Sequence, residues 1–181
     1  MAKIAITGHT AGIGQALAQI YESQGHEIVG LSRRNGYNIR SIPKLVSMIE
    51  PCDIFINNAQ AGFTQTELLF AVYTAWYQKQ KTIINISTMM TSEPVSCLPG
   101  LDMMQYYVQK KTLEEAIVQL KGLHQLPKLC LVKPGGVATQ PGQISPRPYA
   151  DVNAWAKRIV DILDSGPDLS VDEIALGVAF P

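Results

Sequence analysis

Short apolar runs alternate with longer segments of helical periodicity along the chain. The runs are rich in β-branched residues and apolar throughout, as expected of parallel strands covered on both faces. They lie at residues 3–7, 26–31, 53–57, 82–86, 128–133 and 173–178. Helical patterns lie between them, near 12–24, 41–50, 64–80, 103–122 and 151–164. The alternation predicts an α/β fold, with a doubly wound, mostly parallel sheet of about six to seven strands in a single domain over residues 1–181.

One connection is shorter than this scheme requires. Only residues 32–40 separate the second strand from the second helix. Parallel neighbours need a crossover of about a dozen residues or more. We therefore expect Tyr37, Asn38 and Ile39 to form an extended stub rather than a full third strand. The proline-rich segment 139–148 is predicted to be a surface loop.

The composition is that of a globular protein, because 46% of the 181 residues are apolar, 17% are charged and the formal net charge is zero. Neither nucleic acid nor a membrane surface is an expected partner, since no basic or acidic run stands out. No secretory signal or membrane-spanning run is found, and no metal site is predicted. Of the cysteines Cys52, Cys97 and Cys130, the first and last fall at or inside predicted strands and are read as buried free thiols, which favours the cytoplasm.

Three glycines follow the first predicted strand, in the stretch TGHTAGIG. Gly8, Gly12 and Gly14 thus lie in a strand–loop–helix unit. Glycines at such a turn let the backbone approach a pyrophosphate, and the helix N-terminus supplies N–H donors for it. The alternative is that they serve only to pack the helix against the strand.

Four further stretches, in order, are NNAQAG (57–62), INIST (84–88), YYVQKK (106–111) and KPGGVAT (133–139). Together with TGHTAGIG and the tail VDEIALG, the chain resembles the short-chain dehydrogenase/reductase family over nearly its whole length. The resemblance implies a Rossmann-type domain and an NAD(P)-dependent oxidoreductase that interconverts a carbonyl compound and an alcohol by hydride transfer. The cofactor-binding residues that it implies are Gly8, Thr10, Gly12, Ile13, Gly14, Ser32, Arg33, Arg34, Asn38, Ile39, Asn58, Ala59, Tyr106, Lys110, Pro134, Gly135, Val137 and Thr139.

The family's Tyr-x-x-x-Lys motif occurs twice in overlap, as Tyr106 with Lys110 and as Tyr107 with Lys111. Positions three, seven and ten residues after Lys110 are apolar, whereas those after Lys111 include Glu114, which we expect in solvent. We therefore choose Tyr106 and Lys110 and expect the second pair nearer the surface. The spacing puts the ammonium one turn from the phenol, where its charge is expected to lower the phenol pKa. Tyr106 then exchanges a proton with the substrate oxygen.

The resemblance also implies a hydroxyl at the end of the strand INIST. Thr88 is favoured, with Ser87 as the alternative, because strand alternation lets only one of them face the pocket. The family's helix asparagine is missing, since residues 63–84 contain no Asn. Gln60 is considered as its substitute. The missing asparagine supports an alternative function, that of a non-catalytic dinucleotide-binding sensor. A third alternative, a sugar-nucleotide reductase or epimerase, ranks last because little chain follows Thr139.

Cofactor preference is predicted from Ser32, Arg33 and Arg34 at the end of the second strand. NAD sites place a carboxylate there, whereas a guanidinium binds a 2′-phosphate. NADP(H) is therefore predicted, with NAD(H) possible. The methionine-rich segment 89–104 and the loop 139–150 are expected to border a small-molecule carbonyl or alcohol substrate. The helix near 64–80 is apolar nearly all round, so part of its surface needs burial beyond the sheet. The family resemblance implies dimerisation through this helix and the helix near 103–122, so a homodimer or homotetramer is expected.

Overall fold

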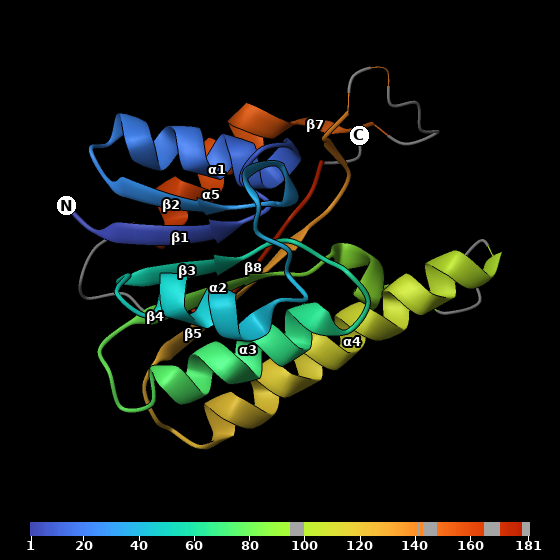
Figure 1. Cartoon of the computed structure of the whole chain (residues 1–181). Helices are drawn as coiled ribbons and strands as arrows, with labels where there is room; N and C mark the ends of the chain where they lie inside the picture. Colours follow the sequence, from blue (N-terminus) through green and yellow to red (C-terminus); the bar gives the residue numbers. More distant parts are fainter. Residues whose placement is uncertain (95–99, 141, 143–147, 165–170, 179–181) are drawn as a thin grey trace.

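A six-stranded parallel sheet forms the centre of the protein (Figure 1). The computed structural model describes residues 1–94, 100–140, 142, 148–164 and 171–178. The strand order is β2-β1-β3-β4-β5-β8, and every neighbouring pair is parallel. The strands are β1 Lys3–Thr7, β2 Glu27–Leu31, β3 Ile54–Asn57, β4 Thr82–Ile86, β5 Lys128–Pro134 and β8 Glu173–Leu176. The predicted doubly wound α/β architecture is confirmed.

Helices cover both faces of the sheet (Figure 1). On one face lie α1 Gly12–Ser23 and α5 Val152–Leu163; on the other lie α2 Ile42–Ile49, α3 Thr64–Ala75 and α4 Gly100–Gly122. Successive strand residues point to opposite faces, so Ile4 and Ile6 pack toward α1 and α5 while Ala5 packs toward α2 and α3. Each buried Ile or Leu side chain contributes about 1.5–3 kcal/mol relative to exposure. Burial on both faces explains the uninterrupted apolar runs.

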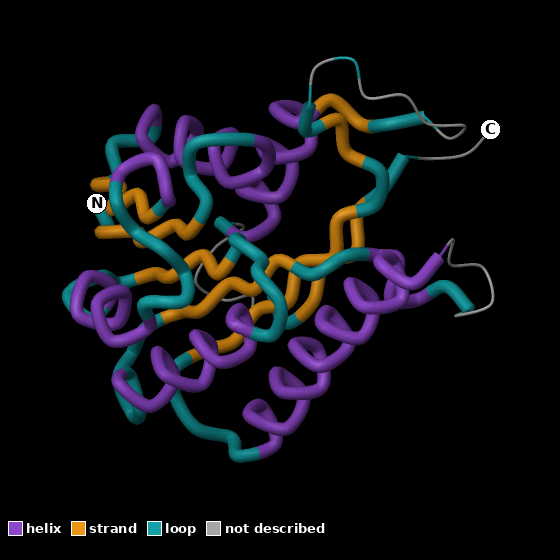
Figure 2. Tube along the Cα trace, turned by 45° about the vertical axis from the view of Figure 1, so that its right-hand side comes forward, coloured by secondary structure: helices purple, strands orange, loops and turns teal. Residues whose placement is uncertain are grey.

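The chain order places a crevice above the middle of the sheet. From β1 the chain passes to β2 on one side and then returns to β3 on the other side of β1. At such a switch point the two connections diverge, and ligands of doubly wound sheets bind there, beyond the carboxyl ends of the strands. The N-terminal part of α4 extends past the sheet at this same end (Figure 2).

No third strand forms at Tyr37–Ile39, as expected, but Ile39 lies in a turn and not in an extended stub. The chain leaves β2 through a 3-10 turn over Arg33–Asn35, and Gly36, with a φ of +86°, reverses its direction. The backbone N–H of Ser32 donates to the Asn35 side chain at 2.8 Å, which tightens the turn. The Ile39 side chain is buried in the core cluster that also contains Leu45 and Ile49 of α2, so the chain turns toward that helix. β2 therefore remains an edge strand.

The remaining connections differ from expectation in smaller ways. α3 ends at Ala75, earlier than its apolar pattern predicts. A 3-10 turn follows β4 over Met89–Ser92, and a small parallel pair joins β6 Val137–Ala138 to β7 Ala150–Asp151. Cys52 and Cys130 are buried free thiols, as predicted, whereas Cys97 and most of the loop 139–148 lie outside the described residues. Among the helices that are described, none combines the length and the apolar character needed to cross a bilayer.

Candidate active site

The glycine-rich loop uses its glycines for two different reasons. Gly8 and Gly12 have φ values of +73° and +55°, a backbone region that side chains disfavour. Gly14 instead allows close packing, because a Cβ there would lie 2.5 Å from the carbonyl oxygen of Gly8. No side chain in the described structure caps the N-terminus of α1, and its first turn carries no acidic residue. The free N–H groups of that turn therefore offer an anion site at the crevice.

The segment after β3 is fixed directly beside this loop. The Thr7 hydroxyl accepts hydrogen bonds from the backbone N–H groups of Asn58 and Ala59, at 2.9 and 3.0 Å. The side-chain amide of Asn58 donates to the carbonyl oxygen of Thr7 at 2.9 Å. These three bonds join the carboxyl ends of β1 and β3, so the motifs TGHTAGIG and NNAQAG form one wall.

A first cavity of about 420 Å³ opens on the β2 side of this wall. Arg34 donates to the carbonyl oxygen of Thr10 at 3.3 Å, which ties the connection 32–40 to the glycine loop. Arg40, which the sequence analysis missed, also lines the cavity, as does Gln60, which was considered only as a substitute for the missing asparagine. Arg40 is signalled only by being a further cation in the same short connection. The predicted cofactor residues found here are Gly8, Thr10, Ser32, Arg33, Arg34, Asn38, Ile39 and Ala59.

A second cavity of about 230 Å³ lies on the other side, under the N-terminal part of α4. Gln60 lines both cavities, so the two adjoin. Gly12 and Gly14 line neither; they shape the loop between the cavities. The predicted residues brought together here are Ile13, Asn58, Thr88, Tyr106, Lys110, Pro134, Gly135, Val137 and Thr139.

Thr88 and Tyr106 contact each other in the second cavity. Burial raises the pKa of the Tyr106 phenol, and a hydrogen bond with the Thr88 side chain opposes that rise. The sequence expectation of a lowered phenol pKa is therefore wrong for the protein alone. The Lys110 nitrogen lies 5.7 Å from the Tyr106 ring centre, too far to offset the loss of solvent around the phenolate. Ser87, the alternative hydroxyl, also lines this cavity, but its hydroxyl donates to Glu114 Oε1 at 2.5 Å.

Lys110 is almost fully buried, with 3% of its surface exposed. Its ammonium donates to Gln65 Oε1 at 2.8 Å and to the carbonyl oxygen of Ile86 at 2.9 Å. Burial lowers the pKa of Lys110 to about 8, and the charge of Glu114 opposes that decrease. In the overlapping motif, Lys111 is exposed and stacks over Tyr107 outside both cavities. The structure therefore directs the first Tyr-x-x-x-Lys pair, and not the second, into the crevice.

Comparisons with known proteins agree with the fold. A short-chain dehydrogenase from Burkholderia cenocepacia, solved in complex with NADP, superposes with a TM-score of 0.75, covering 98% of this chain and 88% of that one at 18% identity. The chain has the short-chain dehydrogenase/reductase fold. A 3-alpha-hydroxysteroid dehydrogenase from Pseudomonas sp., complexed with NADH, superposes over 96% of this chain and 94% of that one, with a TM-score of 0.72 and 18% identity.

Sequence comparison adds one relative. A 3-ketodihydrosphingosine reductase from Bacteroides thetaiotaomicron is 25% identical, over 75% of this chain. The chain spans 64% of the length of that curated relative. No family model matches the chain.

Within the short-chain dehydrogenase/reductase fold, Gln65 is a residue that the sequence analysis missed. Its Nε2 donates to the carbonyl oxygens of Asn57 and Ile86, at 2.7 and 3.0 Å, so its Oε1 must face Lys110. Gln60, the substitute considered for the missing asparagine, contacts Gln109 instead. The available signal was the polar start of the helix after NNAQAG, where Thr64, Gln65 and Thr66 are all buried.

Glu114 is a second departure from the sequence expectation. It was assigned to solvent, yet it is 8% exposed and faces the sheet. Its carboxylate is held by hydroxyls and by Lys133, whose nitrogen lies 3.4 Å from Oε2. A charged side chain is buried only when it is paired. The helix periodicity correctly selected Lys110 as buried, but Glu114, one turn further along the helix, is buried as well.

Proposed function

We propose that the protein is an NADPH-dependent oxidoreductase that interconverts a carbonyl compound and an alcohol by hydride transfer. The observation that carries the proposal is the convergence of Thr88, Tyr106 and Lys110 on one cavity beside the glycine-rich loop. The relatives support it, since their names describe dehydrogenases and reductases with NADP or NADH. The buried free thiols Cys52 and Cys130 fit a reducing compartment such as the cytoplasm.

The crevice has the features that a dinucleotide requires. The uncapped N-terminus of α1, with Gly8 and Gly12 before it, suits the pyrophosphate. The first cavity, with its arginines, suits an adenosine with a 2′-phosphate. The second cavity, between Ile13 and Pro134, suits the nicotinamide. When bound there, the nicotinamide supplies or accepts the hydride.

The protein's own groups would handle the proton and the substrate oxygen. With its raised pKa, the Tyr106 phenol stays protonated at neutral pH and gives its proton to the carbonyl oxygen as the hydride arrives. The Thr88 hydroxyl hydrogen-bonds the same oxygen and fixes its position. The Lys110 ammonium stabilises the phenolate that forms. A phenol that holds its proton at neutral pH is in the protonation state that carbonyl reduction requires.

The direct test is oxidation of NADPH, and in parallel of NADH, with a panel of aldehydes and ketones. Turnover with NADPH is the expected result. The alternative, a dinucleotide-binding sensor, predicts cofactor binding without turnover and no effect of Tyr106→Phe. Absence of both binding and turnover would remove the two candidates together.

The preference for NADPH is expected to depend on Arg33. Replacement by aspartate removes a guanidinium from the first cavity and places a carboxylate near the 2′-phosphate. We expect NADPH binding to weaken about 10- to 100-fold and NADH binding to change little. Isothermal titration calorimetry with both cofactors measures this. The matched control is Arg158→Asp, the same charge change on the exposed face of α5; equal losses for both cofactors in Arg33→Asp would contradict the preference.

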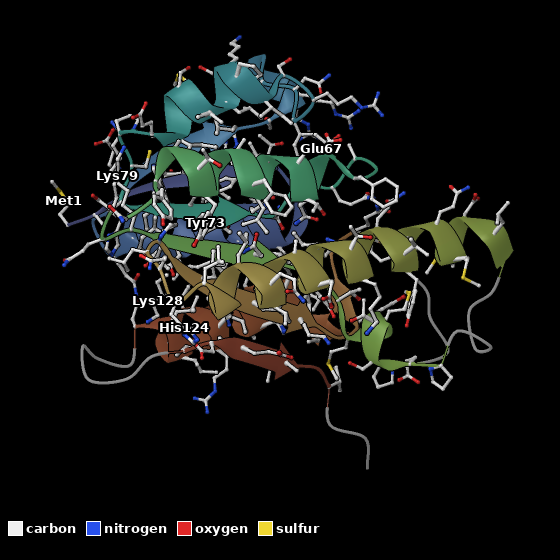
Figure 3. All side chains as sticks on the ribbon, turned by 90° about the horizontal axis from the view of Figure 1, so that it is seen from below. Met1, Glu67, Tyr73, Lys79, His124 and Lys128 are labelled. Carbon is white, nitrogen blue, oxygen red and sulfur yellow. The ribbon has the colours of Figure 1, made fainter. Side chains whose placement is uncertain are left out.

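Self-association is expected through α3 and α4, which lie side by side on one face (Figure 3). Phe70 on α3, with Phe63 just before the helix and Tyr77 just after it, is exposed; the exposed fractions of Phe63, Phe70 and Tyr77 are 48%, 47% and 48%. We propose a homodimer or homotetramer that buries these aromatic side chains. Sedimentation at micromolar concentration should show the oligomer, and Phe70→Glu should shift it to monomer. A monomeric wild type would refute the proposal.

A further inference from the structure

The buried carboxylate of Glu114 collects partners from three segments behind the cavity that holds Tyr106. Oε1 accepts from the Ser87 hydroxyl, which follows β4, at 2.5 Å, and lies 2.6 Å from the Thr91 hydroxyl. Oε2 lies 3.4 Å from the ammonium of Lys133 on β5. A buried charge is costly unless it is paired and hydrogen-bonded, and here both oxygens are occupied.

Two of these partners flank Thr88 in the chain. Ser87 directly precedes it, and the Thr91 hydroxyl also lies 2.7 Å from the carbonyl oxygen of Thr88. Because a hydroxyl has one proton, Thr91 shares it between that carbonyl and the carboxylate. Through Ser87 and Thr91, Glu114 thus holds the backbone before and after Thr88, the residue whose side chain contacts Tyr106.

The same carboxylate also lies beside Lys110. The two residues are one turn apart on α4, and both are buried. The direct acceptors of the Lys110 ammonium, Gln65 and the carbonyl of Ile86, are uncharged. Burial alone drives the lysine toward its neutral form, and the charge of Glu114 is what opposes this. The nearby cation Lys133 has a second anion, Glu173, 4.0 Å away and 54% exposed.

We propose that Glu114 is a positioning residue, which holds the segment bearing Thr88 in place and provides the counter-charge that keeps Lys110 cationic. Its kinetic consequence rests on the proposed function. Its electrostatic consequence concerns the free protein and is testable without cofactor or substrate. Glu114 lines neither cavity, so it acts through Thr88 and Lys110.

The test compares three variants by NMR titration of isotopically labelled lysine side chains, with Lys110 assigned from the signal lost in Lys110→Met. Glu114→Gln keeps the shape of the side chain and removes its charge. The titration midpoint of Lys110 is expected to fall by about one pH unit. Lys133→Met, the matched control, removes a cation and is expected to leave the midpoint unchanged or higher. An unchanged midpoint in Glu114→Gln would overturn the proposal.

Loss of folding must be separated from loss of positioning, because Glu114→Gln leaves Lys133 without its buried partner. The double variant Glu114→Gln/Lys133→Met removes both charges and is expected to recover most of the thermal stability. We expect it to retain the lowered Lys110 midpoint. With a carbonyl substrate, its kcat should fall at least about twofold at neutral pH, the loss that the smaller cationic fraction of Lys110 alone would cause, while KM for NADPH is unchanged. A double variant with wild-type titration and kcat would reduce Glu114 to a structural ion pair.

These readouts also distinguish the two proposals. If the wild type turns over no substrate, the proposed function fails, yet the Lys110 titration still decides the electrostatic role of Glu114. If the wild type is active and the midpoint does not move, the role of Glu114 fails alone.

Discussion

Replacing Tyr106 with phenylalanine is expected to lower kcat about 10²- to 10⁴-fold, the usual contribution of a positioned proton donor. The phenol contacts Thr88 and lines the second cavity, so its hydroxyl is the group best placed to protonate a bound carbonyl. Removing one oxygen atom leaves the ring and its packing in place. Affinity for NADPH and thermal stability should therefore stay close to wild type. Steady-state kinetics measure kcat, a binding titration measures the affinity, and thermal denaturation measures the stability.

The control for Tyr106→Phe lies next to it in the sequence. Tyr107→Phe removes the same atom from a ring outside both cavities, and it is expected to leave kcat within about twofold of wild type. If the two variants lose activity equally, or if Tyr107→Phe alone is inactive, the wrong tyrosine of the overlapping motif has been chosen.

The second large effect is expected from Lys110→Met. The variant removes the ammonium beside Tyr106, so the phenolate formed by proton transfer loses its stabilising charge, and kcat should fall about 10²-fold. Lys111→Met is the matched control, because Lys111 is exposed. Equal kinetics for the two variants would contradict the assignment.

The same variant changes the pH dependence of stability in a defined direction. The folded pKa of Lys110 is about 8, below its unfolded value of 10.5, so the unfolded chain binds more protons between these pH values. The free energy of unfolding therefore gains a contribution that rises from pH 8 to 10.5. Burial raises the pKa values of Tyr21 and Cys130, which act in the opposite direction. Urea denaturation of wild type against Lys110→Met isolates the lysine contribution, and parallel curves would contradict it.

Much of the fold followed from local pattern. The strands were predicted within about two residues because a fully buried strand needs an unbroken apolar run, whatever lies beside it. The choice of Lys110 over Lys111 also needed only local information, since Leu113 and Ile117 mark the buried face of the same helix.

The parts that sequence could not predict depend on partners distant in the chain. Glu114 was assigned to solvent because its cation, Lys133, reaches it only through the pairing of β5 with the sheet. Gln65 was passed over because its acceptor role depends on Lys110, which is 45 residues further along. The turn at Ile39 was not predicted because the residues that pack against its side chain lie on other elements of the chain.

The short connection after β2 also affects whether this edge strand can pair with a strand of another molecule. The outermost strand of a sheet offers unpaired backbone groups to any passing strand. In β2 the carbonyl of Gly30 faces outward, and the Asn35 side chain from the 3-10 turn donates to it at 2.7 Å. The 3-10 turn thereby occupies one backbone acceptor near the carboxyl end of this edge strand and leaves one fewer for pairing with another chain.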